Sequence, residues 1–131
     1  MESKPKTQPI TSFTQLIAWQ KAHAVVLAIY RITKHFPTDE RFGLIDQMRR
    51  AAVSITSNIA EGFGRTNKRE KAQFYSLAYG SLLEVENQLL IARDVGYLDP
   101  KLFQAIAEQC VEVARLLNGL RSEHDKNFRK K

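Results

Sequence analysis

The segment of residues 36–65 constrains the fold more than any other part of the chain. It reads FPTDERFGLIDQMRRAAVSITSNIAEGFGR, and its apolar residues recur every three or four positions, which is the spacing of one helix face. Small residues are frequent in it: Ala51, Ala52, Ser54, Ser57 and Ala60. Because small side chains let helix axes approach closely, the segment predicts a slim helix with neighbours on more than one side.

One helix is expected before Pro37 and another after it, since the residue before a proline is pushed out of the helical region. The first begins near Ser12, where Gln15 completes the spacing of a capping box. The second follows at once, with Thr38 or Asp39 as its N-cap. We therefore expect no gap of more than a few residues between them.

Turn residues mark the remaining helix ends. Gly62 and Gly64 are expected to end the second helix in a left-handed conformation, and Asn67 with Glu70 is expected to start the third. Gly96 is a natural C-cap for the third helix, and a fourth helix follows from position 99. Four helices joined by short connections predict an all-α protein, an antiparallel up-down-up-down four-helix bundle.

This bundle is assigned to residues 12–124 of the 131-residue chain, a length that suits one domain. Residues 1–11 are expected to be a disordered N-terminal segment, and residues 125–131 a basic C-terminal tail.

The apolar arc of the third helix is wider than one bundle can cover, because Leu83 and Leu90 add to an already complete face. That excess predicts self-association, since a large exposed apolar patch is unusual in a monomer.

The composition favours a cytoplasmic protein. Cys110 is the only cysteine, which excludes an internal disulfide and fits a reducing compartment. No apolar run approaches the roughly 20 residues of a membrane span, and the polar N-terminus has no signal-peptide core. We expect no membrane association.

The net charge of +6 is distributed unevenly. Residues 41–71 carry seven basic and three acidic side chains, whereas residues 72–120 carry three basic and six acidic ones. The basic positions considered for phosphate contact are Arg49, Arg65, Lys68, Arg69, Lys71, Arg129, Lys130 and Lys131. Such a cluster favours sequence-independent binding of RNA or DNA through the phosphate backbone. The alternative is a solvated loop with ordinary solubility charge.

A polar stripe on the second helix consists of Arg50, Ser54, Asn58 and Glu61. We interpret it as a structural polar network in which Glu61 pairs with an arginine, because buried polar groups require partners. On this interpretation, removing Glu61 breaks a buried pair and destabilises the fold strongly. The alternative is a polar ligand pocket.

The remaining residues form no pattern that is typical of an enzyme active site. His23 lies on the apolar face of the first helix and is expected to be a hydrogen-bonded core histidine rather than a metal ligand. Cys110 lies among core positions and is expected to be a buried, unreactive thiol. Glu84 and Glu86 point to different helix faces, so they do not form a di-iron signature. We expect no catalysis, no cofactor and no metal.

Three strings carry a family resemblance: FTQLIAWQKAHAVVLAIYRIT, the segment of residues 36–65 quoted above, and FYSLAYGSLLEVENQLLIARDVGYL. With them, residues 13–98 closely resemble the four-helix bundle family encoded by intervening sequences in bacterial 23S ribosomal RNA genes. The most specific part is ERFGL followed by RRAAVSI and SNIAEG. Thr56 departs from the pattern, because the family commonly has proline there.

The resemblance implies a ring-like homopentamer. It also implies kinship with nucleic-acid-binding accessory proteins of diversity-generating retroelements, which partner a reverse transcriptase. Two functions are therefore expected as alternatives. The first is a non-enzymatic oligomer that binds RNA or DNA. The second is a structural adaptor for a protein such as a reverse transcriptase.

Overall fold

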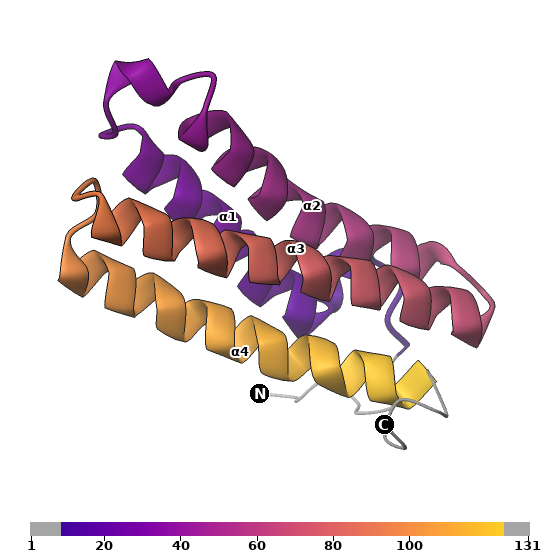
Figure 1. Ribbon diagram of the computed structural model, residues 1–131. Helices are drawn as coiled ribbons and strands as arrows, with labels where there is room; N and C mark the ends of the chain where they lie inside the picture. The colour runs from indigo at the N-terminus through magenta and orange to yellow at the C-terminus, as the bar shows by residue number, and fades with distance from the viewer. Residues whose placement is uncertain (1–8, 125–131) are drawn as a thin grey trace, which may run out of the picture.

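The computed structural model describes residues 9–124 and contains four long helices and no strand within that range. Figure 1 shows these helices lying side by side, with bounds α1 (Ile17–Thr33), α2 (Leu44–Gly64), α3 (Lys68–Asp94) and α4 (Pro100–His124). Residues 1–8 and 125–131, including nearly all of the expected N-terminal segment and the whole basic tail, lie outside the described residues.

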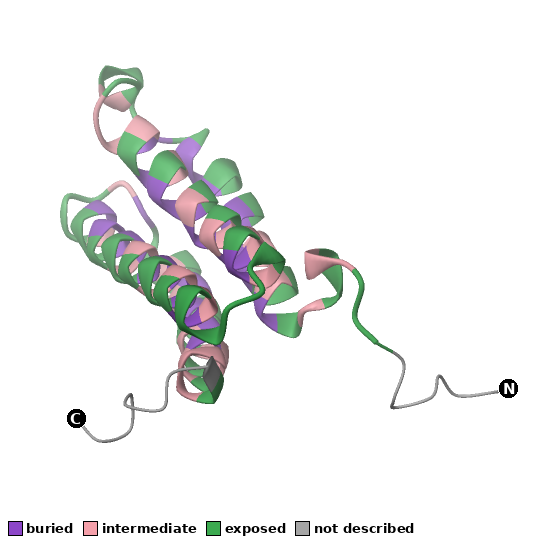
Figure 2. Cartoon of the chain, turned by 90° about the vertical axis from the view of Figure 1, so that its right-hand side faces the viewer, coloured by how far each residue is buried: buried purple, intermediate pink, exposed green. Residues whose placement is uncertain are grey.

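The four helices share one apolar core. Helix α2 packs against α1 and α3, and α4 packs against α3 and α1, so that the bundle closes on itself. The core consists mainly of Ala, Val, Ile and Leu, with Met48 and Tyr75 among its largest fully buried side chains. Figure 2 shows buried residues on the inward sides of the helices and exposed residues on the outward sides.

Helix α1 begins later than the sequence predicts. The capping box of Ser12 and Gln15 is present, but it caps a separate 3-10 turn, Phe13–Gln15. Leu16 then takes an extended conformation (φ −72°, ψ 128°), so the α-helix starts only at Ile17. The prediction of a helix from Ser12 was wrong because a capping box satisfies the first N–H groups of any helical turn, 3-10 or α.

Helix α2 also begins later than expected. Thr38 and Asp39 belong to a short 3-10 turn, Thr38–Glu40, and α2 starts at Leu44. Gly43 is its N-cap and provides no side-chain acceptor, but the Glu40 carboxylate accepts a hydrogen bond from the Leu44 N–H at 3.2 Å. Glu40, four residues before Leu44, therefore caps the start of α2, a role that the sequence analysis assigned to Thr38 or Asp39.

The glycines at the end of α2 do not act as left-handed caps. Gly62 and Gly64 lie within the helix, and Gly96 is the only described residue with positive φ, at 90°. A Cβ atom on Gly62 would lie 2.8 Å from a ring carbon of Tyr75 on α3. Gly62 is therefore required for the close approach of α2 to α3, while Gly96 follows the end of α3 as predicted.

The other helix signals are found where the sequence places them. The Asn67 side chain accepts hydrogen bonds from the backbone N–H groups of Arg69 and Glu70 and so caps α3. Helix α2 runs unbroken through Thr56, the position at which the family commonly has proline. Within the described residues, no helix is long and apolar enough to cross a membrane.

Candidate nucleic-acid interface

The turn between α2 and α3 presents two unengaged cations. Lys68 and Arg69 are the first residues of α3, and both are exposed. Over residues 9–124 the structure shows no ion pair or side-chain hydrogen bond for either of them. Their positive charges are therefore available to an external anion.

The two other cations of this turn are engaged within the chain. The Lys71 ammonium donates hydrogen bonds to the carbonyls of Gly62 and Phe63, at 3.2 and 2.9 Å. A cation there neutralises the negative end of α2 and satisfies its last carbonyls. Lys71 is thus a helix cap, so its assignment as a phosphate contact is not supported by this geometry.

Arg65 is shared between two neighbours. Its guanidinium bonds the Glu61 carboxylate at 3.0 Å and lies 4.8 Å from the centre of the Phe74 ring. The Arg65 side chain keeps 43% of its surface exposed. Arg65 therefore stays beside Lys68 and Arg69 at the turn, with its charge partly neutralised.

Arg49 lies away from this turn. It precedes Arg65, the residue that follows the end of α2, by sixteen positions, which corresponds to about 24 Å along the helix axis. Its Nε donates to the Thr33 hydroxyl at 2.9 Å, and its guanidinium covers the Tyr30 ring at 4.7 Å. Arg49 ties α2 to α1 and does not join the basic turn. The tail positions Arg129, Lys130 and Lys131 lie outside the described residues.

The polar stripe of α2 is not one network. Arg50 pairs with Asp46 at 3.0 Å, and Glu61 pairs with Arg65. Between these two pairs, Asn58 donates to the backbone carbonyl and the hydroxyl of Ser54. The Ser54 hydroxyl in turn shares a 2.8 Å hydrogen bond with the Ser81 hydroxyl on α3.

No described hydrogen bond or ion pair joins these three groups. Arg50 reaches back one turn and is 79% exposed, so it cannot meet Glu61 further along the helix. The expected partner of Glu61, an arginine, is present, but the pair lies at the surface. Only the serine and asparagine group connects two helices.

The residues with potential for catalysis or metal binding have structural surroundings. Burial, with a further contribution from the charge of Glu86, raises the pKa of Cys110 to about 12. His23 is half-buried and stacks on Trp19, with ring centres 4.6 Å apart. Within residues 9–124, no three His, Cys, Asp or Glu side chains gather in a group that could hold a metal ion.

One anchoring cation was missed by the sequence analysis. Arg121, near the end of α4, donates to the Ser76 hydroxyl at 3.1 Å and covers the Tyr79 ring at 4.5 Å. Both partners lie on α3, so Arg121 fastens α4 to it. The sequence analysis assigned Arg121 no role, because its distance from α3 cannot be read from the sequence.

The fold and this turn define an all-α, four-helix protein with a small basic surface. The chain belongs to the 23S rRNA-intervening sequence protein family, whose model matches residues 14–119. It is also similar in fold to a crystal structure of a protein of unknown function from the S23 ribosomal protein family of Bacteroides thetaiotaomicron VPI-5482. That match has a TM-score of 0.75 and 19% identity, and it covers 81% of this chain and 96% of the other. No functionally curated protein matches the chain.

Proposed function

We propose that this protein is a non-enzymatic oligomer that binds RNA or DNA through the phosphate backbone. The observation that carries the proposal is the pair of exposed, unengaged cations Lys68 and Arg69 at the start of α3. Asn67 already occupies the N–H groups of Arg69 and Glu70, so the side chains rather than the helix end would contact phosphate. Contacts of this kind are indifferent to base sequence.

The proposal includes the assembly. Short connections and the packing of sequential helices support an antiparallel up-down-up-down order. Exposed apolar side chains along α3 support self-association: Leu77, Leu83, Leu90 and Ile91. The ring-like homopentamer is the form of oligomer that the family resemblance implies. A ring would repeat the Lys68 and Arg69 pair around its axis, so that one long polyanion meets several copies and gains avidity.

Reversal of both charges tests the binding site. We expect Lys68→Glu with Arg69→Glu to abolish binding of a labelled RNA or DNA oligonucleotide, measured by fluorescence anisotropy. The matched control is Arg31→Glu with Lys101→Glu, which makes the same change in net charge at exposed positions on α1 and α4. Equal binding by wild type and the double variant at Lys68 and Arg69 would refute the proposed site.

A protein adaptor is the second candidate function, and the exposed apolar residues of α3 favour it. An accessory factor of a reverse transcriptase in a diversity-generating retroelement is one such adaptor. If the wild-type protein binds neither RNA nor DNA at about 50 mM salt, where phosphate contacts are strong, the adaptor becomes the leading function. The cytoplasmic location stays a prediction for both functions.

The absence of catalysis is part of the same proposal. Cys110 is fully buried and its pKa is raised to about 12, so it is poorly suited to act as a nucleophile near neutral pH. The His23 ring stacks on the Trp19 indole.

A further inference from the structure

Phe42 is the most exposed large apolar side chain of the described residues, at 87%. It lies in the connection between α1 and α2, which projects beyond the bundle at the upper left of Figure 1. The Arg41 guanidinium lies 5.3 Å from the centre of its ring. An aromatic ring with an adjacent arginine is the composition typical of an anchor that a partner surface buries.

The connection that carries Phe42 is held in place from two sides. One oxygen of the Glu40 carboxylate accepts from the Leu44 N–H, and the other accepts from the Tyr97 hydroxyl at 2.9 Å. Phe36 is buried and packs against the Tyr97 ring, with ring centres 5.4 Å apart. Because the loop is already ordered, burial of Phe42 in a partner loses less conformational entropy than burial from a flexible loop.

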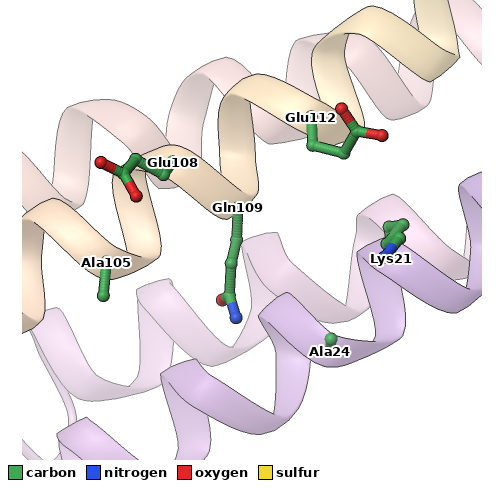
Figure 3. A pocket seen from close by; sticks show the side chains of 6 residues that line it. All are labelled: Lys21, Ala24, Ala105, Glu108, Gln109 and Glu112. Carbon is green, nitrogen blue, oxygen red and sulfur yellow. The ribbon is translucent and has the colours of Figure 1, made fainter.

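A hollow of suitable size lies elsewhere on the same chain. Figure 3 shows the side chains that line it on α1 and α4. Its volume is about 310 Å³. Ala24 on α1 and Ala105 on α4 are small, and Gln109 points from α4 toward α1 between them. The hollow is a depression open to solvent, and four of its six lining residues are polar or charged. A closed apolar cavity of about 150 Å³ accommodates a benzene molecule, so by volume alone the hollow has room for one phenyl ring.

The charge beside the ring is opposite to the charges on one side of the hollow. Glu108 and Glu112 line its α4 side, whereas Lys21 lines its α1 side. A hydrogen bond from Arg115, and further the charges of Arg115 and Lys21, lower the pKa of Glu112, so that carboxylate is ionised at neutral pH. Within the described residues, the Glu108 carboxylate accepts a hydrogen bond from the Gln104 amide and has no basic partner. Arg41 has no acidic partner there.

We propose that Phe42 of one copy inserts into the α1–α4 hollow of a second copy and places Arg41 against Glu108. The anchor and the hollow are different surfaces of one chain, so the contact is head-to-tail. In a pair of copies, one keeps a free hollow and the other keeps a free anchor. Head-to-tail contacts close into rings or continue as filaments. This inference rests on the proposed self-association and adds a second contact to the apolar face of α3.

Two variants test the contact from its two sides. Phe42→Ala removes the anchor, and Ala105→Trp fills the hollow at an exposed position. We expect each to weaken self-association by about tenfold or more, measured by sedimentation velocity over a concentration series, with an unchanged melting temperature. The control is Val111→Ala, which removes an exposed apolar side chain that does not line the hollow.

Mixing the two variants gives the sharper result. Ala105→Trp keeps its anchor and Phe42→Ala keeps its hollow, so the mixture should form a one-to-one heterodimer that cannot grow further through this contact. Charge exchange, Arg41→Glu with Glu108→Arg, should restore assembly that Arg41→Glu alone weakens.

If wild type assembles and both variants assemble equally well, the contact is wrong and the proposed oligomer stands. A mixture without heterodimer also overturns the contact. A wild type that stays monomeric overturns both the contact and the oligomer, while nucleic-acid binding is judged separately by the Lys68 and Arg69 variant.

Discussion

At the scale of single residues, Gly62 has the least room for a side chain among the glycines. A Cβ there would lie 2.8 Å from Tyr75 and 3.1 Å from Phe74. We expect Gly62→Ala to destabilise the fold by about 1–3 kcal/mol, as insertion of an extra carbon into a packed core does. Urea denaturation measures this change in the free energy of unfolding.

Gly80 is the matched control on the facing helix. It lies in the interior of α3, and nothing would lie within 4 Å of an added Cβ in the chain. Gly80→Ala should therefore stabilise by roughly 0.5–1 kcal/mol through helix propensity. If both glycine substitutions change stability in the same direction, the packing explanation for Gly62 is wrong.

Glu61→Ala is predicted to have little effect on stability. The Glu61 and Arg65 side chains are 57% and 43% exposed, and exposed ion pairs contribute about 0–1 kcal/mol. The sequence interpretation of a buried network implied a much larger loss. A loss above about 2 kcal/mol in a urea titration would return Glu61 to a buried structural role.

Cys110 should resist thiol reagents while the protein is folded. Its pKa of about 12 lies above the ordinary value of 9.0, so the folded state favours the neutral thiol. We expect iodoacetamide at pH 8 to label it at least about 100-fold more slowly in the native protein than in urea. The same shift destabilises the fold as pH rises from 9 toward 12, because the unfolded chain ionises first. Equal labelling rates in the two states would show that the thiol is accessible.

At the scale of helices, the start of α2 depends on Glu40. Its carboxylate is the only described side-chain acceptor at that start, and it also bonds Tyr97 in the connection between α3 and α4. We expect Glu40→Ala to destabilise the protein by about 1–3 kcal/mol in chemical denaturation. The control is Asp39→Ala, an adjacent exposed acid, which should leave stability unchanged; a similar loss from both would remove Glu40 from this role.

The sequence predicted which helices exist more accurately than where they begin. Asn67 and Gly96 were assigned correctly because a cap and a positive φ each depend on one residue and its immediate neighbours. The starts of α1 and α2 were placed too early because a 3-10 turn and an α-helix use the same capping residues. Gly62 was misread as a cap because its requirement comes from Tyr75, which approaches from another helix.

The candidate site was predicted only in part for a similar reason. Charge clustering indicated Lys68 and Arg69, both of which are exposed and unengaged. The same clustering also included Lys71 and Arg49, whose partners are carbonyls on α2 and a hydroxyl on α1. A count of charges along the chain cannot separate a cation that caps a helix from one that faces solvent.

At the scale of the whole molecule, the charge of +6 and the exposed apolar residues of α3 point to two kinds of contact. Apolar surfaces and the Phe42 anchor would join copies of the chain, and the basic turn would meet a polyanion. These contacts use different residues.

Variants at Phe42 should therefore weaken the avidity of the protein for long RNA. Short oligonucleotides, which contact one copy at a time, should bind these variants as tightly as they bind the wild-type protein.

The salt dependence of nucleic-acid binding tests the central claim most directly. Affinity for a single-stranded oligonucleotide would be measured from about 50 to 200 mM salt for wild type and for Lys68→Glu with Arg69→Glu. Two phosphate contacts per chain predict a slope of about −1.4 or steeper in log affinity against log salt for wild type, with the double variant not binding. A slope near zero, or an unchanged slope in the double variant, would contradict binding through this turn.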